Sequence, residues 1–487
     1  MAGMEYLPWR RSALHDERPC IRDERHRLTY AEFAAWVEAA AEQFAEHGVG
    51  RGSVVGIMLP NRVELLVAMV AAWRIGAAAT PINPMFTVNE ADYQIQDADA
   101  ALVVNAGPDA PDGGRPALAV DALRRQPEGT LPPAATRSDD LALLVYTSGT
   151  TGRPKGVMLD HANLEAMSSM MADTMRLTFE DHCLLFLPLF HVNAICVSFL
   201  APMRSGGQLS VLQRFTVEGF LDAVERLRPT YFSGVPTVYA MLLAQPREAD
   251  FSSVRFAVCG AAPASKELLR SAEERFGFVL AEGYGLTECT CAATSNRWDG
   301  VRKAGTVGPA LPGQRVEIMA PDGRILPRGE RGEVVVQGPN VMRGYLNRPD
   351  ATAETLRDGW LHTGDVGVLD EDGYLRIVDR IKDVIIRGGE NIYPKEIETV
   401  LLAHPGVMEA AVIGAPDEKF GEVPFAYLSR YPGADLDVDD LLKRCQDQLT
   451  RFKVPVGVRV LEALPKNPIG KIDKPALRRQ HRITTGA

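Results

Sequence analysis

The most informative stretch of the chain reads Tyr146-Thr147-Ser148-Gly149-Thr150-Thr151-Gly152-Arg153-Pro154-Lys155-Gly156. It contains four Ser and Thr hydroxyls, three glycines and a lysine. Apolar residues flank it at 141–145 and 157–159, and each run predicts a buried strand. The stretch is therefore expected to form a loop between two strands of a core sheet.

The composition of this loop indicates a site that binds a polyphosphate. Glycines let backbone N–H groups approach phosphate oxygens closely, and hydroxyls add further hydrogen-bond donors. Lys155 adds a compact positive charge. The loop is not a P-loop, because Gly156 and a strand follow the lysine where that motif has Ser or Thr and the start of a helix. Kinases and P-loop ATPases are therefore disfavoured.

Helix and strand signals alternate in the part of the chain before the loop. Capping-box spacing occurs at Thr29 and Glu32 and again at Asn61 and Glu64, and each pair predicts the start of a helix. The apolar residues 54–58 predict a buried strand between these two helices. Strand, helix and strand in succession indicate parallel pairing in an α/β core.

From about residue 300 the pattern changes to pairs of strands joined by tight turns. Residues 316–319 and 333–337 alternate in polarity on either side of a turn at 321–323. Residues 366–369 and 374–378 flank a second turn in the same way. This part of the chain is therefore expected to be an antiparallel β module.

The last part of the chain has a compact α+β pattern. Pro394 is a suitable first residue for a helix over residues 395–403. Strands are expected over residues 408–413 and 423–428, and a helix over residues 438–449.

These patterns predict an α/β protein with two domains of unequal size. Residues 1–380 are expected to form a large N-terminal domain of mostly parallel sheets flanked by helices, together with the β module. Residues 381–487 are expected to form a small α+β C-terminal domain.

Composition and charge exclude several classes of protein. Of the 487 residues, 46% are hydrophobic and 24% are charged, which is typical of a globular protein with a large core. A net charge of -10 disfavours nonspecific nucleic-acid binding, which depends on clustered Lys and Arg. The seven cysteines form no disulfide framework, and neither a signal peptide nor a membrane-spanning run is evident. We therefore expect a cytoplasmic protein without nucleic-acid or membrane partners.

Six further motifs follow the loop along the chain. They are Phe190-His191, Gly260-Ala261-Ala262-Pro263, Gly283-Tyr284-Gly285-Leu286-Thr287-Glu288, Thr363-Gly364-Asp365, Asp379-Arg380-Ile381-Lys382 and the segment 465–471. With the loop, this ordered series resembles the adenylate-forming superfamily, which includes acyl- and aryl-CoA synthetases, firefly luciferase and the adenylation domains of peptide synthetases. Within the superfamily the chain is similar to AMP-dependent synthetases of the 4-coumarate–CoA ligase type. The resemblance covers essentially the whole chain.

The resemblance implies a reaction in two steps. ATP with Mg²⁺ would activate a carboxylic acid as acyl-AMP and release pyrophosphate, and the acyl group would then pass to CoA. Attack on the α-phosphate builds negative charge, which the enzyme must neutralise while it holds the reacting groups in line. Lys471 is similar to the family lysine that bridges the carboxylate and the α-phosphate. Thr287 and Glu288 are similar to residues that contact the α-phosphate and Mg²⁺, and His191 to a residue beside the acyl group.

The resemblance also implies the nucleotide site. Asp365 would bind the ribose hydroxyls, Arg380 would lie near the ribose and phosphates, and Tyr284 would enclose adenine together with residues 260–263. Thr151 and Glu288 would be the magnesium ligands. The ATP-binding residues implied in this way are Thr147, Ser148, Gly149, Thr150, Thr151, Lys155, Gly260, Ala261, Ala262, Glu282, Gly283, Tyr284, Gly285, Thr287, Asp365, Arg380 and Lys382.

The two half-reactions need different groups at one site, and the family is known for rotating its small domain about a hinge. Here the hinge residue would be Lys382, and rotation would withdraw Lys471 from the site. Gly388 and Gly389 would then let the pantetheine arm of CoA pass close to the backbone, although the pair also suits a tight turn. Arg214 corresponds to a basic residue that binds the CoA 3′-phosphate.

The expected acyl pocket contains His191, Val192, Cys196, Gly234, Gly260 and Cys289. No aspartate follows the Phe190-His191 motif to pair with an ammonium group, which disfavours amino acids. Gly283 stands where malonyl-CoA synthetases carry an arginine, and a buried second carboxylate without a cation is unfavourable. We therefore expect a medium-chain fatty, alicyclic or aryl acid.

Two other readings stay open at this level. The enzyme could load a carrier-protein thiol instead of CoA, since the same core residues serve both acceptors. A catalytically inactive relative that acts as a binding protein is a more remote alternative. The sequence is equally compatible with a monomer and a homodimer.

Overall fold

The chain folds into two compact units. The first comprises Met1–Val316 and Val336–His362, and the second comprises Glu317–Val335 and Thr363–Ala487. The computed structural model describes residues 3–10, 16–134, 136–147, 153–262, 264–431, 433–466 and 472–485. The predicted boundary between residues 1–380 and 381–487 marks a point of domain rotation, which a single structure does not test, so it stays a prediction. The compact grouping places residues 363–380 in the second unit.

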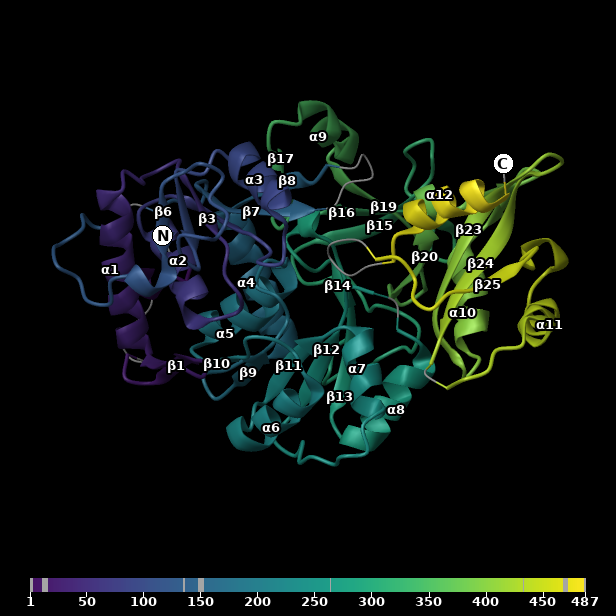
Figure 1. Ribbon diagram of the computed structural model, residues 1–487, viewed down its shortest axis with the longest axis horizontal. Coiled ribbons are helices and arrows are strands. Elements are labelled where there is room, and N and C mark those ends of the chain that lie inside the picture. Colours follow the sequence, from purple (N-terminus) through teal and green to yellow (C-terminus); the bar gives the residue numbers. More distant parts are fainter. Residues whose placement is uncertain are drawn as a thin grey trace. The chain divides into compact units, whose positions relative to one another are not determined.

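Two large sheets organise the first unit (Figure 1). One has seven strands in the order β17-β8-β7-β4-β3-β5-β6, and the other has eight in the order β14-β13-β12-β11-β9-β10-β1-β2. Strands β3 to β7 pair in parallel with one another, as do β1 and β9 to β13, while β2, β8, β14 and β17 pair antiparallel. The predicted α/β fold class with mostly parallel sheets is confirmed.

The strands of the seven-stranded sheet are β3 (Val54–Ile57), β4 (Ala78–Pro81), β5 (Leu102–Asn105), β6 (Ala117–Ala119), β7 (Leu141–Thr147), β8 (Lys155–Asp160) and β17 (Gly344–Tyr345). Those of the eight-stranded sheet are β1 (Pro19–Arg22), β2 (Arg27–Thr29), β9 (His182–Leu185), β10 (Gln208–Val211), β11 (Tyr231–Gly234), β12 (Phe256–Cys259), β13 (Val279–Tyr284) and β14 (Thr294–Ser295). The helices of this unit are α1 (Tyr30–Glu46), α2 (Val63–Arg74), α3 (Val88–Asp97), α4 (His161–Met175), α5 (Ala201–Ser205), α6 (Val217–Leu227), α7 (Pro236–Leu243), α8 (Lys266–Phe276) and α9 (Pro349–Thr355), with a π-helix at Ala194–Leu200.

The starts of two helices test the capping-box predictions. The box at Thr29 and Glu32 is present at the start of α1. The helix predicted from Asn61 and Glu64 is present as α2, but the capping box is wrong, because Arg62 is the N-cap and makes no side-chain capping bond. Asn61 instead donates to the carbonyl oxygen of Leu187 at 2.9 Å, and Glu64 is buried in an ion pair with Arg62 at 2.7 Å. Glu64 also lies 3.0 Å from Nε2 of the distant His26, so both polar side chains are engaged by other partners and neither caps the helix.

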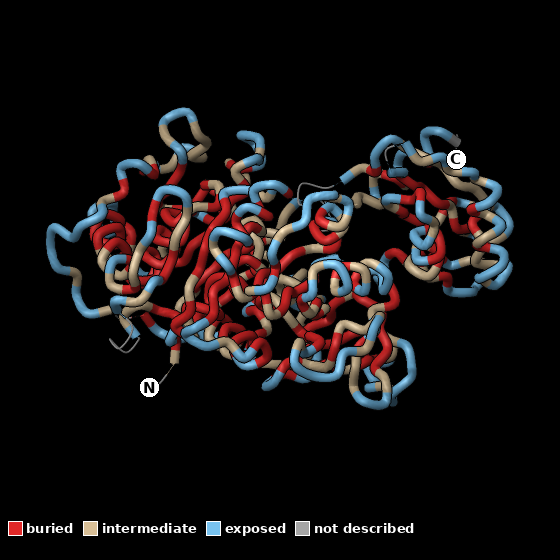
Figure 2. Tube along the Cα trace, turned by 90° about the horizontal axis from the view of Figure 1, so that it is seen from below, coloured by how far each residue is buried: buried red, intermediate tan, exposed pale blue. Residues whose placement is uncertain are grey.

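The two largest apolar cores among the described residues of the first unit pack helices against its sheets. One combines α1, α2 and α4 with strands of both sheets and includes Phe33, Trp73 and Leu143, all without exposed surface. The other lies between α6, α7, α8 and the strands β11 to β13, and it includes Phe220 and Phe232. Figure 2 shows buried residues following the strands while exposed residues occupy the outer turns and helix faces.

The second unit contains a sheet in the order β22-β21-β24-β23, with β25 paired to β24. Helices α10 and α12 pack on β23, and α10 begins at Pro394 as predicted. A five-stranded sheet in the order β15-β16-β19-β18, with β20 paired to β19, confirms the β module; β18 and β20 pair antiparallel with β19, and β15, β16 and β19 contribute residues to both units. The remaining bounds are β15 (Arg315–Met319), β16 (Arg331–Gln337), β18 (Leu356–Arg357), β19 (Trp360–Leu369), β20 (Leu375–Arg380), β21 (Ile385–Arg387), β22 (Glu390–Ile392), β23 (Val407–Asp417), β24 (Gly421–Arg430), β25 (Val458–Val460), α10 (Pro394–Leu402), α11 (Val438–Gln448) and α12 (Lys474–Thr485).

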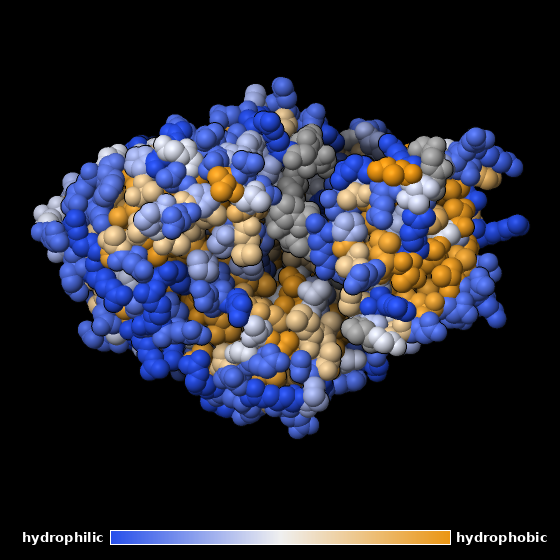
Figure 3. Space-filling view, in the orientation of Figure 1, coloured by the Kyte–Doolittle hydropathy of each residue, from blue (hydrophilic) through white to orange (hydrophobic). Residues whose placement is uncertain are grey.

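The surface is mainly polar. On the face drawn in Figure 3, hydrophilic side chains cover most of the first unit, and apolar side chains gather over the strands of the second unit around β24 and β25. Within the described part of the chain, every helix is too short or too polar to span a membrane.

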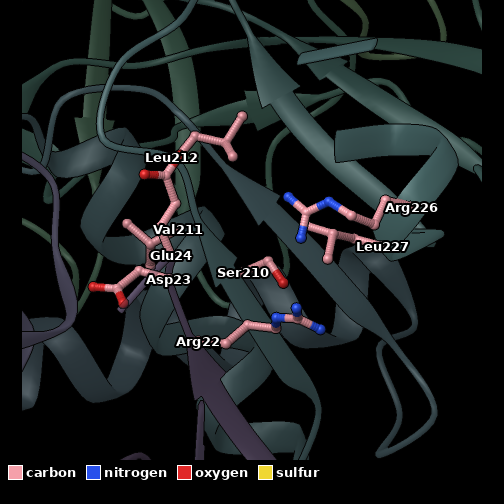
Figure 4. Close-up of a pocket in the computed structure, with 8 residues that line it drawn as sticks. All are labelled: Arg22, Asp23, Glu24, Ser210, Val211, Leu212, Arg226 and Leu227. Carbon is pink, nitrogen blue, oxygen red and sulfur yellow. The ribbon is translucent and has the colours of Figure 1, made fainter. Parts of the chain in front are cut away.

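A buried histidine makes the stability of the first unit depend on pH. The Nε2 atom of His182 in β9 lies 2.7 Å from the hydroxyl of Ser210 in β10. Ser210 and Arg22 line a small surface pocket at the ends of β1 and β10, drawn in Figure 4. Burial, and then the positive charge of Arg22, lowers the pKa of His182 from its ordinary 6.5 to about 4.

We expect the free energy of unfolding to fall as the pH falls from 6.5 towards 4. In that range the unfolded chain binds a proton at His182 that the folded chain does not, so acid favours unfolding, by up to about 3 kcal/mol from this histidine. Urea unfolding of the wild type and of His182→Asn at pH 7.5 and 4.5 measures the effect, and the variant should lose less stability between the two pH values. The exposed His47→Asn serves as control and should keep the wild-type pH dependence. An unchanged pH dependence in His182→Asn would contradict the prediction.

Candidate active site

The polar loop is anchored by an antiparallel pair of strands. β7 ends at Thr147, β8 begins at Lys155, and these two residues are cross-strand partners. The strands predicted on either side of the loop are therefore confirmed. Four of the predicted phosphate contacts, Ser148, Gly149, Thr150 and Thr151, lie outside the described residues.

Polar side chains fix the base of this loop. The hydroxyl of Tyr146 donates to one carboxylate oxygen of Asp97 at 2.8 Å, and Arg348 pairs with the other at 2.9 Å. Burial, and then the hydrogen bond to Asp97, raises the pKa of Tyr146, so its hydroxyl stays protonated and donates at neutral pH. The hydroxyl of Tyr93 donates to the carbonyl oxygen of Pro154 at 3.0 Å. Both ends of the loop are thus held by side chains as well as by the strand pair.

The predicted adenine-binding segments meet at one edge of the eight-stranded sheet. Gly260 follows the carboxyl end of β12, and Tyr284 ends the neighbouring parallel strand β13. A Cβ atom on Gly260 would lie 3.4 Å from the carbonyl oxygen of Gly283, so the two segments are in contact. Ligands of open parallel sheets bind at the carboxyl ends of the strands. The fold therefore places residues 260–262 and 282–285 where a nucleotide base is expected.

At two positions in these segments the backbone restricts which residue fits. Ala261 has φ +65°, in the left-handed region that disfavours a Cβ atom. A Cβ atom on Gly285 would lie 2.0 Å from the carbonyl oxygen of Cys291, so only glycine fits there. A strained non-glycine residue often marks a functional site, and Ala261 lies in a segment that the sequence assigns to the nucleotide.

Thr287 and Glu288 lie on a short 3-10 helix, Thr287–Cys289, that follows β13. This turn is tied to a distant segment of the chain. The side-chain amide of Asn340 donates to the backbone carbonyl oxygen of Cys289 at 3.0 Å. The backbone carbonyl oxygen of Asn340 accepts from the hydroxyl of Thr290 at 2.5 Å. The buried Asn340 therefore fixes the direction in which the Glu288 side chain leaves the backbone.

The structure adds Tyr345, which the sequence analysis did not single out. Its hydroxyl donates to Glu288 Oε1 at 2.7 Å, and the ammonium nitrogen of Lys155 lies 4.6 Å from the centre of its ring. Gly344 and Tyr345 form a two-residue strand that belongs to none of the predicted strands. A short strand carries too little periodicity to be recognised in the sequence.

The residues present fit a magnesium ion bound together with ATP. Mg²⁺ prefers oxygen ligands and usually binds through one or two carboxylates plus substrate phosphates, while it keeps several waters. Glu288 supplies one such carboxylate, and one of its oxygens has no hydrogen bond to another described residue. The other predicted ligand, Thr151, lies outside the described residues.

The candidate acyl pocket begins after β9. The ring of His191 lies 4.5 Å from that of Phe190, and Val192 is buried next to it. The hydroxyl of Ser233, near the carboxyl end of β11, donates to the side-chain oxygen of Asn193 at 2.9 Å. This polar pair joins the neighbours of two predicted pocket residues, Val192 and Gly234, and the sequence did not predict the contact.

Thiols line the inner side of these segments. Cys196 donates to the carbonyl oxygen of Thr290, and Cys289 to that of Leu286, each at 3.3 Å. Both cysteines are fully buried. Burial raises the pKa of Cys289 to about 12, and a hydrogen bond with Cys291 together with burial raises that of Cys196. The thiols are therefore neutral and unreactive, and in this structure neither Cys196 nor Cys289 presents a surface to solvent.

In the second unit, Asp365 and Arg380 meet as cross-strand partners on β19 and β20. Arg380 Nε donates to Asp365 Oδ1 at 2.9 Å, and Asp365 is buried. The hydroxyl of Thr363 donates to Val334 and accepts from the backbone N–H of Asp365 at 3.1 Å. The two residues assigned to the ribose and phosphates therefore lie side by side. Lys382, the predicted hinge, follows Arg380, and partial burial and this neighbouring charge lower its pKa.

The residues predicted to bind CoA lie in exposed positions. Gly388 and Gly389 have φ values of +58° and +89° and form the turn between β21 and β22, so the tight-turn reading describes their local structure. Arg214 is exposed in the loop after β10. The predicted catalytic Lys471 lies outside the described residues. The CoA assignments stay predictions.

The pocket in Figure 4 does not belong to this site. It is lined by Arg22, Asp23, Glu24, Ser210, Val211, Leu212, Arg226 and Leu227, none of which was predicted to bind a substrate. A second hollow, on the second unit, is lined by Gln446, Leu449, Arg451 and Val454 and also contains no predicted site residue.

Two protein-family models match the chain. The model described as AMP-binding enzyme matches residues 9–346. The model described as AMP-binding enzyme C-terminal domain matches residues 396–471.

Individual relatives match almost the full length of the chain. A feruloyl-CoA synthase from an Amycolatopsis species is 38% identical over 488 residues, which cover 98% of this chain and 99% of that protein. ATP-bound MatB from Rhodopseudomonas palustris has a TM-score of 0.92 at 35% identity, and the match covers 99% of both chains. The o-succinylbenzoate CoA synthetase MenE from Bacillus subtilis, in complex with its acyl-adenylate intermediate, has a TM-score of 0.87 at 34% identity and 96% coverage of both chains. The same synthetase has been solved with ATP and a magnesium ion.

The strained backbone of Ala261 gives a test of stability. We expect Ala261→Gly to stabilise the protein by about 1 kcal/mol, because glycine adopts φ +65° without the steric penalty of a Cβ atom. The neighbouring Ala262→Gly, at a residue without a positive φ, is the matched control and should be neutral or destabilising. Urea unfolding of both variants measures the difference. A loss of stability in Ala261→Gly as large as that in Ala262→Gly would contradict the interpretation.

Proposed function

Because the chain belongs to the family of AMP-binding enzymes, it is an acid–thiol ligase, and we propose that the acid it activates has a neutral, apolar tail. The enzyme activates a carboxylic acid with ATP as acyl-AMP, releases pyrophosphate and transfers the acyl group to CoA. ATP, Mg²⁺ and CoA are therefore its cosubstrates and cofactor.

The first half-reaction needs positive charge and hydrogen-bond donors around the phosphates. We assign this role to Thr147, Lys155 and the loop between them, and we assign Mg²⁺ to Glu288. When bound, Mg²⁺ neutralises charge on the phosphates. Asp365 would accept hydrogen bonds from the ribose hydroxyls, and Arg380, which already pairs with it, would hold its carboxylate in place.

Lys471 and the hinge complete the proposed mechanism. Lys471 would hold the attacking carboxylate against the α-phosphate, where it also offsets the charge that develops in the transition state. Transfer to CoA needs the site to open to a thiol, and we propose that rotation about Lys382 replaces Lys471 by the turn at Gly388 and Gly389.

The neutral-tail proposal is carried by one observation. The candidate pocket segments at 192–196, 233–235, 260–261 and 289–293 contain no Lys, Arg, Asp or Glu. A second carboxylate or an ammonium group buried there would lose its hydration without gaining an ionic partner.

Two contacts and one relative agree with this choice of acid. The thiols of Cys196 and Cys289, both fully buried, are neutral and bring no charge to these segments. The bond between Ser233 and Asn193 offers neutral polar atoms that suit an oxygen substituent on a ring. The 38% identical relative is named for feruloyl-CoA, the thioester of an aromatic acid.

We also propose a cytoplasmic location. All seven cysteines are free, as expected in a reducing compartment.

The acid class is tested with a panel of carboxylic acids. Pyrophosphate release with MgATP is measured for medium-chain fatty, alicyclic, benzoic and arylpropenoic acids, with malonate and amino acids as charged comparisons. We expect kcat/KM for the best neutral acid to exceed that for the charged acids at least about 100-fold, because a buried unpaired charge raises the barrier by several kcal/mol. A charged acid as the best substrate would overturn the neutral-tail proposal.

The same panel, run with and without CoA, tests the acceptor. Multiple turnovers that require CoA, with formation of an acyl-CoA product, are expected. Pyrophosphate release that CoA does not change would point to a carrier-protein thiol as the acceptor, while the adenylation chemistry would stand.

The role of Lys471 predicts that the two half-reactions separate. We expect Lys471→Ala to slow acyl-AMP formation by at least about 100-fold, a typical loss when a positioned charge is removed, and to change thioester formation from supplied acyl-AMP less than about twofold. Lys466→Ala is the matched control, because Lys466 lies in the same segment and pairs with Glu409 at 2.9 Å. Equal losses in both half-reactions would exclude a role for Lys471 in adenylation alone.

A further inference from the structure

We propose that Tyr345 is a positioning residue for the first half-reaction. Its side chain holds the Glu288 carboxylate where it can bind Mg²⁺ and the Lys155 ammonium group where it can bind the phosphates, and it keeps these two charges apart. The inference rests on the proposed function and deepens it. It follows from the backbone around Tyr345, the two contacts of its side chain and the charges that it separates.

The backbone next to Tyr345 connects the two motifs. The N–H of Met342 donates to the carbonyl oxygen of Glu288 at 2.9 Å. Three residues after it in the chain, Tyr345 pairs with Val157 of β8, and the N–H of Leu346 donates to the carbonyl oxygen of Gly156 at 2.8 Å. Residues 342–346 therefore form a backbone link from the Glu288 turn to the strand that begins at Lys155.

The side chain of Tyr345 contacts both functional groups from this link. Its hydroxyl donates to Glu288 Oε1 at 2.7 Å, and its ring faces Lys155 Nζ at 4.6 Å from the ring centre. A cation above an aromatic face is attracted by the negative potential of the ring. The Tyr345 hydroxyl thus contacts the Glu288 carboxylate, and the Tyr345 ring contacts the Lys155 ammonium group.

The conformation of Tyr345 is fixed by burial and by a second link. The residue is 7% exposed, and its N–H donates to the hydroxyl of Thr352 at 2.9 Å. Gly344 has φ +140°, and a Cβ atom there would lie 2.7 Å from the Thr352 side chain, so this approach requires glycine.

The contacts have a consequence for charge. Among the described residues, Lys155 and Glu288 form no ion pair with each other, although both contact Tyr345. A direct ion pair would neutralise the lysine that the phosphates need and the carboxylate that Mg²⁺ needs. The ring occupies the space beside Lys155 while the hydroxyl holds one oxygen of Glu288, which leaves the other oxygen for a metal ligand bond.

Residues that orient a metal ligand through a hydrogen bond strongly influence metal affinity. Tyr345→Phe keeps the ring and removes the hydroxyl that donates to Glu288. We therefore expect the Mg²⁺ concentration for half-maximal pyrophosphate release to rise about tenfold, within the range observed for such partners. Thioester formation from supplied acyl-AMP should stay within about twofold of wild type, because that step uses neither the γ-phosphate nor pyrophosphate release.

Tyr345→Leu removes the ring as well as the hydroxyl. Because this variant also loses the interaction of the ring with Lys155, we expect its KM for ATP to rise a few-fold, in addition to the effect on Mg²⁺. Tyr30→Phe is the matched control, because Tyr30 is buried on α1 and its hydroxyl donates to the backbone carbonyl of Gly207. It should lower stability without a change in the Mg²⁺ requirement.

A binding measurement makes the test independent of turnover. Calorimetry with a non-hydrolysable ATP analogue, at a series of Mg²⁺ concentrations, should show the same weakening in Tyr345→Phe as the kinetic assay. If no acid gives pyrophosphate release with the wild type but Tyr345→Phe still weakens Mg²⁺-dependent binding of the analogue, the proposed function fails and the positioning role stands. If Tyr345→Phe keeps the wild-type Mg²⁺ dependence in both measurements, or lowers both half-reactions equally, the positioning role is wrong.

Discussion

The hydrogen bonds that residues 342–346 make to the Glu288 turn and to the start of β8 are the constraint on which the candidate site depends. The polyphosphate loop is anchored in one sheet, and the Glu288 turn follows a strand of the other. A reaction at phosphorus needs the two to keep a constant separation, because misplacement of charged groups by about 1 Å slows such reactions strongly. A short backbone link between them supplies that separation without a large interface of its own.

The parallel strands explain why the remaining groups gather near this link. Parallel strands end at one edge of the sheet, so the segments after β9, β11, β12 and β13 meet although they are far apart in sequence. At that edge the backbone is under strain at Ala261 and tightly packed at Gly285. Such positions persist only where the surrounding sheet and helices determine them completely. The segments at this edge contain small residues, buried neutral thiols and a Ser–Asn hydrogen bond, in keeping with the apolar acyl group that we propose.

In the second unit, hydrogen bonds within the unit hold the predicted nucleotide-binding side chains in place. Asp365 and Arg380 pair across the β19–β20 hairpin, and Thr363 ties the same turn to Val334. These contacts all lie within the second unit, so they do not depend on where that unit lies relative to the first. Two half-reactions at one site, as we propose, require this property, because each set of residues must stay intact while the hinge moves.

The sequence by itself determined the features that depend on local pattern. The hydroxyl-rich and glycine-rich loop between apolar runs, the turns of the β module and Pro394 at the start of a helix were all readable from composition and spacing, and the ordered motifs identified the family. Only the tertiary structure decided which side chains from distant segments meet. Asn61 and Glu64 have the spacing of a capping box, yet Asn61 binds Leu187 and Glu64 lies against His26 instead. The contacts of Tyr345 with Glu288 and Lys155, and of Ser233 with Asn193, join residues that are between 40 and 190 positions apart. No sequence period records such contacts, because they arise from the packing of strands and turns that are distant in the chain.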